Sequence, residues 1–561
     1  MKTIRLGLVG LFAVVASCTT PVSQAQADIV LRGGTIYDGS GGAPYVGDVA
    51  IRGDRIACVG RCPGAARQEI DARGLAVAPG FINMLSWANE SLIADGRGQS
   101  DIRQGVTLEV MGEGESMGPW NAAMKANEIK RQGDIKYPIR WTSLGEYLQF
   151  MEAKGVSPNV ASFVGATTVR VHELGERDID PTPAELARMR GLVRTAMNEG
   201  AMGVGSSLIY APANFAETPE LIALTTEAGR CGGRYISHIR DEGPKLLEAI
   251  DELVEISEKS GAPAEIYHFK QSGRENWSKI DAAIARVEAA RARGVKVSAD
   301  MYTYPASSTG FDAAFPLWLQ DGGLEAWVGR LKDPALRTKA FAEMHRPDAS
   351  ENTKLVIDEP DKVLLVGFKT DALKSLTGKS LGEVARARGK SPEDTAADLI
   401  VADGTRIQVV YFGMSEANVA REVALPWMSF GSDAAAMAPE GVFLKSSTHP
   451  RAYGNVARLL GKYVREEKRL TLAEAVRRLA ALPADNLKIA DRGRLKPGYF
   501  ADIAVFDPAK IADTATFAKP QQLAVGMADV FVNGVAVLRD GEHTGATPGR
   551  FVRGPGWKKC D

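Results

Sequence analysis

The sequence predicts an α/β fold, a (β/α)8 barrel of the TIM type with a small β-sandwich domain built from both ends of the chain. Three observations support this fold class. The middle of the chain alternates apolar, strand-like segments with amphipathic, helix-like segments. Both ends contain short strand patterns separated by glycine-rich turns. Hydrophobic residues make up 45% of the 561 positions, which is enough for a large core and excludes global disorder.

The two ends of the chain have the same strand-and-turn character. Residues 28–32 and 47–52 flank a glycine-rich turn, and residues 55–59 follow the turn Gly53-Asp54, as in a hairpin. Residues 500–506 and 528–534 are also strand-like and end in turn residues. We therefore predict one β domain assembled from residues 28–75 and 486–545, with residues 546–561 as a tail.

The middle, residues 76–485, supplies the barrel. Helix-like segments separate most of the strands, and a longer interval at about 311–420 is predicted to hold an insertion. Such alternation is typical of a parallel barrel with its helices outside. The expected strands are 76–81, 106–111, 160–164, 202–206, 235–238, 264–269, 295–300 and 427–432, and four of the expected helices are 183–198, 219–230, 245–260 and 277–293.

The first residues are typical of an export signal. Lys2 and Arg5 precede an uncharged stretch at 6–17 that is too short to span a bilayer. Val15-Ala16-Ser17-Cys18 resembles a lipoprotein box and favours a lipid anchor on Cys18, whereas Ala25-Gln26-Ala27 offers a site that would release a soluble chain. We assign residues 1–27 to the signal and expect a periplasmic protein, with an outer-membrane lipoprotein as the favoured form.

The charge balance bears on the binding partners of the protein, and the cysteine count bears on its disulfides. Lys and Arg number 68 against 69 Asp and Glu, and this balance argues against a nucleic-acid partner. Five cysteines are too few for a disulfide scaffold. Cys58 and Cys62 are close enough to pair in an oxidising compartment, although a reduced pair fits equally well, and Cys231 and Cys560 have no evident partner. The oligomeric state is left open.

One motif suggests serine chemistry. Gly114-Glu115-Ser116-Met117-Gly118 fits G-x-S-x-G, and Asp433 and His449 follow it in the order of α/β-hydrolases. That motif needs a strand directly before it and a helix directly after it. The predicted strand ends at 111 and Pro119 follows the motif at once, so we disfavour Ser116 as a nucleophile.

Histidines at strand ends suggest a metal site instead. His238 and His268 close the fifth and sixth predicted strands, and Asp433 follows the eighth. Side chains at the carboxyl ends of barrel strands converge over the mouth of the barrel. Two histidines and a carboxylate are the minimum set for a hydrolytic zinc site.

Seven motifs in a fixed order make the chain resemble a known family. Over residues 28–540 it resembles the amidohydrolase superfamily, and specifically the N-acyl-D-amino-acid deacylase, or D-aminoacylase, family. The motifs are Ala78-Pro79-Gly80-Phe81-Ile82, Ser206-Ser207-Leu208-Ile209-Tyr210-Ala211-Pro212, Ser237-His238-Ile239-Arg240-Asp241-Glu242, His268-Phe269-Lys270 with Asn276-Trp277, Tyr302-Thr303-Tyr304-Pro305-Ala306-Ser307-Ser308-Thr309, Gly431-Ser432-Asp433 and His449-Pro450-Arg451-Ala452-Tyr453-Gly454.

The resemblance implies a role for each matching residue. His238 and His268 would hold the tightly bound zinc, and Asp433 would be the general base that moves a proton from water to the leaving nitrogen. The contacts to the carboxylate of a small substrate would come from Lys270, Tyr302, Ser308 and Arg451.

The sequence departs from the family at two places. The superfamily has Asp-x-His-x-His on strand one, where this chain has Asn83-Met84-Leu85-Ser86-Trp87, so a second metal on strand one has little support. Gly114 stands at the position of the strand-two cysteine ligand. Glu113 or Glu115 can replace the thiolate, since a carboxylate also binds zinc, and we favour Glu113. One zinc per chain is therefore expected.

We predict an exported, zinc-dependent amidohydrolase that cleaves the amide of N-acyl-D-amino acids or related acyl-amino compounds, a hydrolase of C–N bonds other than peptide bonds. Two alternatives stay open. The same site can serve another amide, a cyclic amide or a lactone. If neither glutamate binds metal, the chain would be a catalytically silent exported binding protein.

Overall fold

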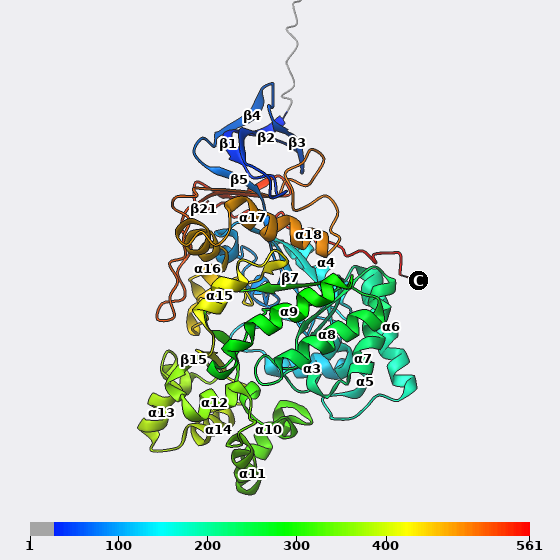
Figure 1. The fold of residues 1–561 in the computed structure, drawn as a ribbon, viewed down its shortest axis with the longest axis vertical. Coiled ribbons are helices and arrows are strands. Elements are labelled where there is room, and N and C mark those ends of the chain that lie inside the picture. The colour runs from blue at the N-terminus through cyan, green and yellow to red at the C-terminus, as the bar shows by residue number, and fades with distance from the viewer. Residues whose placement is uncertain (1–26, 561) are drawn as a thin grey trace, which may run out of the picture.

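The computed structural model describes residues 27–560 (Figure 1). The predicted export signal, including Cys18 and all but the last residue of Ala25-Gln26-Ala27, lies outside the described residues. Within 27–560, no helix combines the length and the apolar character that a membrane crossing requires.

Eight parallel strands of the described residues form the barrel. The third strand is interrupted at Phe163, so it consists of two short pieces. Strand pairing runs in chain order from the first strand to the last. The strands are β6 (Phe81–Asn83), β7 (Val106–Met111), β8 (Asn159–Ser162) with β9 (Val164–Gly165), β10 (Gly203–Ser207), β11 (Arg234–His238), β12 (Ala264–Ile266), β13 (Val297–Met301) and β17 (Met428–Phe430).

Backbone hydrogen bonds close the barrel between its last and first strands. The amide of Met84, just after β6, donates to the carbonyl oxygen of Phe430 at 3.1 Å. The amide of Asp433 donates to the carbonyl oxygen of Leu85 at 2.9 Å. The predicted fold class is therefore confirmed, and Asp433 is fixed at the same rim as the ends of β7 and β11.

Amphipathic helices cover the outside of the barrel, as their sequences predict. α8 buries Ile250, Leu253 and Val254 on one face. α6 begins with a capping box, in which the Thr182 hydroxyl accepts from the Glu185 amide, and Pro183 stands at its first position. The outer helices are α4 (Leu144–Lys154), α5 (Ala166–Leu174), α6 (Pro183–Glu199), α7 (Thr218–Arg230), α8 (Leu246–Ser260), α9 (Ile280–Ala292), α15 (Glu416–Glu422) and α16 (Arg451–Arg458).

Strands from both ends of the chain share one sheet, which lies at the top of Figure 1. Within the described residues this sheet has nine strands, and β5 joins its halves by pairing with both β1 and β18. The strands are β1 (Ala27–Ile36), β2 (Tyr45–Arg52), β3 (Arg55–Gly60), β4 (Ala66–Asp71), β5 (Ala76–Pro79), β18 (Ile503–Phe506), β19 (Met527–Val532), β20 (Val535–Arg539) and β21 (Glu542–His543).

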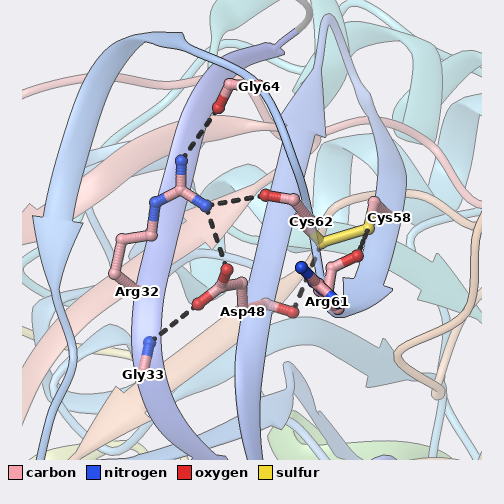
Figure 2. Close-up of a disulfide and its surroundings, with 7 residues drawn as sticks. All are labelled: Arg32, Gly33, Asp48, Cys58, Arg61, Cys62 and Gly64. Atoms are coloured by element: carbon pink, nitrogen blue, oxygen red, sulfur yellow. Dashed lines mark hydrogen bonds and ion pairs between the residues drawn. A yellow bond between two sulfur atoms is a disulfide. The ribbon is translucent and has the colours of Figure 1, made fainter.

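A disulfide joins Cys58 and Cys62 at the edge of this sheet (Figure 2). Arg32 on β1 donates to the carbonyl oxygens of Cys62 at 2.8 Å and Gly64 at 3.0 Å, and it pairs with Asp48 on β2. Of the two states compatible with the sequence, the structure has the paired one.

The interval between β13 and β17 contains a subdomain with its own apolar core, at the bottom left of Figure 1. A three-stranded antiparallel sheet in the order β14-β16-β15 packs with five helices. Its elements are β14 (Ser307–Gly310), α10 (Gly323–Leu331), α11 (Pro334–Met344), α12 (Glu351–Asp358), β15 (Val363–Gly367), α13 (Leu381–Arg388), α14 (Pro392–Asp403) and β16 (Gln408–Tyr411).

The C-terminal tail runs along the amino ends of the barrel strands. The Val552 amide donates to the carbonyl oxygen of Val160 at 2.9 Å, and the Gly554 amide donates to that of Gly200 at 2.8 Å. Cys560 forms a disulfide with Cys231, which corrects the expectation that neither has a partner. The two cysteines are separated by 329 positions, so only the fold brings them together.

Candidate metal centre

A cavity of about 420 Å³ opens at the carboxyl ends of the barrel strands. Glu113, His238 and His268 lie in its wall together with Asp433 and Arg451. The inserted subdomain supplies part of the opposite wall and is tied to the barrel there. The Thr309 hydroxyl on β14 is 2.7 Å from the Tyr210 hydroxyl, and Arg406 donates to it at 2.6 Å.

Three buried side chains converge in this cavity. Glu113 Oε1 lies 3.0 Å from His238 Nδ1 and 3.2 Å from His268 Nε2. The three atoms form the one group of histidine, cysteine and carboxylate donors within residues 27–560 that is arranged to hold a metal ion. One oxygen and two imidazole nitrogens are a donor set that suits zinc and leaves a fourth position open. These residues therefore fit the metal that the family implies.

The backbone explains why position 113, and not 114, contributes a carboxylate. Gly114 has φ of +68°, and a Cβ built there would lie 2.7 Å from the side chain of Ser207. A ligand side chain at 114 would collide with β10. The Glu113 side chain is directed at His238 and His268. Glu115 is exposed in the cavity wall and does not belong to the group of three metal-binding side chains.

His268 and Asp433 both have left-handed backbones, with φ of 35° and 48°. The predicted strand 264–269 ends early, at Ile266, and the His268 amide donates to Asp300 Oδ1 at 2.9 Å. His268 therefore follows its strand by two residues, whereas His238 is the last residue of β11. Asp300 is a buried residue that the sequence analysis did not single out.

Glu242, from the motif Ser237-His238-Ile239-Arg240-Asp241-Glu242, lies behind both histidines. Its Oε1 is 3.0 Å from His268 Nδ1, and its Oε2 is 3.5 Å from His238 Nε2. These are the ring nitrogens that face away from Glu113. A carboxylate there favours the tautomers that leave the inner nitrogens free as metal ligands. Its position four residues after His238 is the signal that could have identified it.

The residues predicted to bind a substrate carboxylate differ in whether their N–H and O–H groups already form hydrogen bonds within the protein. Lys270 Nζ donates to Glu242 Oε1 at 2.5 Å and to the His268 carbonyl oxygen at 3.0 Å, so two of its three N–H groups are engaged. The Tyr302 hydroxyl donates to Met414 Sδ, and the Ser308 hydroxyl donates to the Val409 carbonyl oxygen.

Arg451 differs from these three residues. It is buried and pairs with Asp433 Oδ2 at 2.8 Å, and its guanidinium lies over the Tyr302 ring. Its Nε and Nη1 have no hydrogen-bond partner among the described residues. A guanidinium with unpartnered N–H groups beside a cavity has the geometry that binds carboxylates.

Burial and neighbouring charges shift the pKa values of the cluster in different directions, and burial lowers the pKa of His238. Burial raises the pKa of Glu113, but hydrogen bonds from His238 and His268 outweigh it and hold that pKa well below its usual range. Burial and Lys270 lower the pKa of His268, whereas Glu242 and Glu113 raise it, and the result is about 10. Burial raises the pKa of Asp433 against the effect of Arg451. A histidine nitrogen binds a metal only when it carries no proton, so metal affinity at this cluster depends on pH.

The serine alternative does not assemble. The Ser116 hydroxyl donates to the Gly118 carbonyl oxygen at 2.6 Å and accepts from the Gly165 amide at 2.9 Å. His449 Nδ1 accepts from the Arg451 amide, and its Nε2 faces the Ala306 carbonyl oxygen. Within the described part of the chain, neither nitrogen is available to Ser116.

Comparisons agree with a barrel hydrolase of the amidohydrolase class. A model of the amidohydrolase family matches residues 428–539. D-aminoacylase of Alcaligenes xylosoxydans xylosoxydans is 33% identical over 94% of this chain and 97% of that protein. A solved D-aminoacylase, described by a binuclear centre with one-metal activation and second-metal attenuation, has a TM-score of 0.79 and 31% identity over 94% of this chain and all of that one.

A further solved structure is N-acyl-D-glutamate deacylase of Bordetella bronchiseptica, in complex with zinc and a phosphonate inhibitor. It has a TM-score of 0.76 and 28% identity over 94% of this chain and 99% of that one. The chain belongs to the D-aminoacylase family of amidohydrolases. The predicted resemblance is confirmed, and so is the prediction of a metal-dependent hydrolase of C–N bonds other than peptide bonds.

Proposed function

We propose that this protein is a zinc-dependent deacylase that hydrolyses the amide bond of N-acyl-D-amino acids, with one zinc per chain. The observation that carries the proposal is the convergence of Glu113, His238 and His268 beside Asp433. Arg451 adds a buried cation with two free donors for the substrate carboxylate. The substrates in the names of similar proteins, N-acyl-D-glutamate among them, have this carboxylate.

Each residue has a defined task in this reaction. Glu113 Oε1, His238 Nδ1 and His268 Nε2 would hold the zinc, which when bound supplies Lewis-acid polarisation of the scissile carbonyl and acidifies the attacking water. Asp433 accepts a proton as the water oxygen bonds to the carbonyl carbon. It then gives that proton to the nitrogen as the C–N bond breaks, releasing a carboxylic acid and an amine.

The test is a substrate panel with detection of the released amine. We expect turnover of N-acetyl-D-amino acids and at least 10-fold lower kcat/KM for the L-enantiomers. Turnover only of a hydantoin or a lactone would support another reaction on the same site. Tight binding of N-acetyl-D-amino acids without turnover in the zinc-loaded protein would support a silent binding protein.

The carboxylate anchor is tested by Arg451→Met. A lost charge-assisted hydrogen bond is worth about 1.5–3 kcal/mol, so we expect kcat/KM to fall roughly 10- to 100-fold. The control is Arg386→Met, because Arg386 is exposed and pairs with Asp361 on the inserted subdomain. Equal kcat/KM in the two variants would contradict the role of Arg451.

We also propose that the protein is exported and anchored by a lipid on Cys18. The two disulfides support an oxidising compartment, and Cys18 is the one remaining cysteine of the five. Fractionation of cells should find the protein with the membranes, and Cys18→Ala should move it to the soluble periplasmic fraction. Cytoplasmic recovery of both forms would contradict the proposal.

A further inference from the structure

Trp87 places one N–H group between two carboxylates of the centre. Its Nε1 lies 3.0 Å from Glu113 Oε2 and 3.1 Å from Asp433 Oδ1. One carboxylate follows β7 and the other follows β17, so the indole bridges side chains from two separate loops. The Trp87 side chain is 37% exposed and forms part of the cavity wall.

The two oxygens that accept the hydrogen bond from Trp87 are the carboxylate oxygens that point away from the histidines and from Arg451. Glu113 directs Oε1 to the two histidines, which leaves Oε2 on the side of Trp87. Asp433 directs Oδ2 to Arg451, which leaves Oδ1 on that side. These are the two carboxylate oxygens beside the histidine cluster that His238, His268 and Arg451 do not engage, so a second cation at this point would have to compete with the indole N–H for them.

The residues that follow β6 supply no metal ligand next to these oxygens. Leu85 is fully buried, and Gly431 packs directly against it. Trp87 itself offers an N–H donor and no lone pair, so it cannot bind a cation. The described residues hold no other group of three metal-binding side chains near this point.

We propose that Trp87 takes the place of a second cation, so that the centre binds one zinc ion even in excess zinc and excess zinc does not attenuate activity. This inference rests on the metal centre proposed above. The indole N–H keeps the outer oxygens of Glu113 and Asp433 in position without adding positive charge. For a similar D-aminoacylase, one metal ion is described as activating and a second as attenuating. This chain would lack the attenuation by a second metal ion.

The experiment is a zinc titration of the metal-free wild-type protein, followed by calorimetry, elemental analysis after gel filtration and activity. We expect one zinc per chain at 10 equivalents, and constant activity between one and 10 equivalents. Two zinc ions per chain, together with turnover of N-acetyl-D-amino acids, would overturn the inference and the one-zinc stoichiometry while leaving the proposed deacylase reaction intact. No bound zinc would remove the proposed centre, and the inference would fall with it.

Variants test the part played by the indole. Trp87→His supplies a nitrogen ligand, and we expect it to bind a second zinc at 10 equivalents and to lose activity as that zinc binds. Trp557→His is the control, because Trp557 is 39% exposed in the C-terminal tail, and it should bind one zinc. If Trp87→His and Leu85→His/Trp87→His both stay at one zinc, Trp87 is not what limits the centre, and the proposal is wrong.

Discussion

The metal cluster depends on residues that never touch the metal. Glu242 faces the outer nitrogens of both histidines, and Lys270 lies against Glu242. Asp300 holds the amide of His268 in its left-handed conformation. A second layer of this kind sets which ring nitrogen carries a proton and therefore which one can bind zinc.

Glu242→Gln tests this layer at the scale of one residue. The amide keeps the size of the side chain but presents a weaker acceptor, so the histidine tautomers are less well fixed. We expect zinc affinity, measured by competition with a chelator, to fall roughly 10- to 100-fold. Glu248→Gln is the control, since Glu248 is exposed on α8. Equal affinities would show that Glu242 does not position the histidines.

Residue identities were predictable where a side chain ends a strand. The meeting of His238, His268 and Asp433 in one cavity wall was predictable, because barrel strands direct their carboxyl ends to one rim. Trp87 and Glu242 were not assigned, because their positions depend on how loops fold back over the rim. The choice of Glu113 over Glu115 required the path of the loop after β7, which brings Glu113 Oε1 to both histidines and leaves Glu115 outside the cluster.

At the scale of elements, the inserted subdomain meets the barrel through buried acidic groups. Glu351 begins α12, and burial, with Asp241 close by, raises its pKa to about 8. Below pH 4.5 the carboxyl is protonated in the folded and unfolded chains alike. Between pH 4.5 and 8 only the folded chain keeps the proton, so the contribution of Glu351 to stability is lost as pH rises.

Glu351→Gln should remove that pH dependence. A single group changes the free energy of unfolding by at most about 1.4 kcal/mol per pH unit. We expect the melting temperature of the wild type to fall more steeply than that of Glu351→Gln between pH 5 and 8. Glu325→Gln, at a side chain that is 85% exposed, should follow the wild type. Parallel curves for wild type and Glu351→Gln would refute the account.

The ends of elements were the least predictable part of the fold. α6 was predicted within one residue because Thr182, Pro183 and Gly200 mark both of its ends. The strand at 264–269 was predicted too long, since its apolar pattern continues past Ile266 while the backbone turns at His268. Hydrophobic periodicity in the sequence indicates which residues are buried. Buried residues just beyond the end of a strand continue the same apolar pattern, so the pattern does not mark where the strand ends.

At the scale of the whole molecule, the C-terminal tail is bound to the amino ends of the barrel strands by backbone hydrogen bonds and a disulfide, on the side opposite the metal centre. Cys560 and Cys231 close a loop across 329 positions, whereas Cys58 and Cys62 close one across four. Chain entropy makes the long crosslink worth roughly 6 kcal/mol and the short one about 2 kcal/mol. The disulfide between Cys231 and Cys560 could not be predicted from short-range sequence patterns, because only the folded chain brings the two cysteines together.

Cys560→Ser should therefore lower the melting temperature more than Cys58→Ser does. Both variants should keep the wild-type kcat, because both disulfides lie away from the cavity wall. Differential scanning calorimetry of the oxidised proteins checks the order. A larger loss in Cys58→Ser would contradict the ranking, and a lower kcat in Cys560→Ser would contradict the separation of the base from the site.

The most direct test of the central claim is metal reconstitution of the wild type beside Asp433→Asn, assayed with an N-acetyl-D-amino acid. The metal-free wild type should be inactive and should recover full activity at one equivalent of zinc. Asp433→Asn should bind zinc with similar stoichiometry and lose at least 100-fold in kcat, because its amide cannot carry the proton. Activity in the metal-free wild type, or in zinc-loaded Asp433→Asn, would contradict a reaction in which Asp433 acts beside a zinc held by Glu113, His238 and His268.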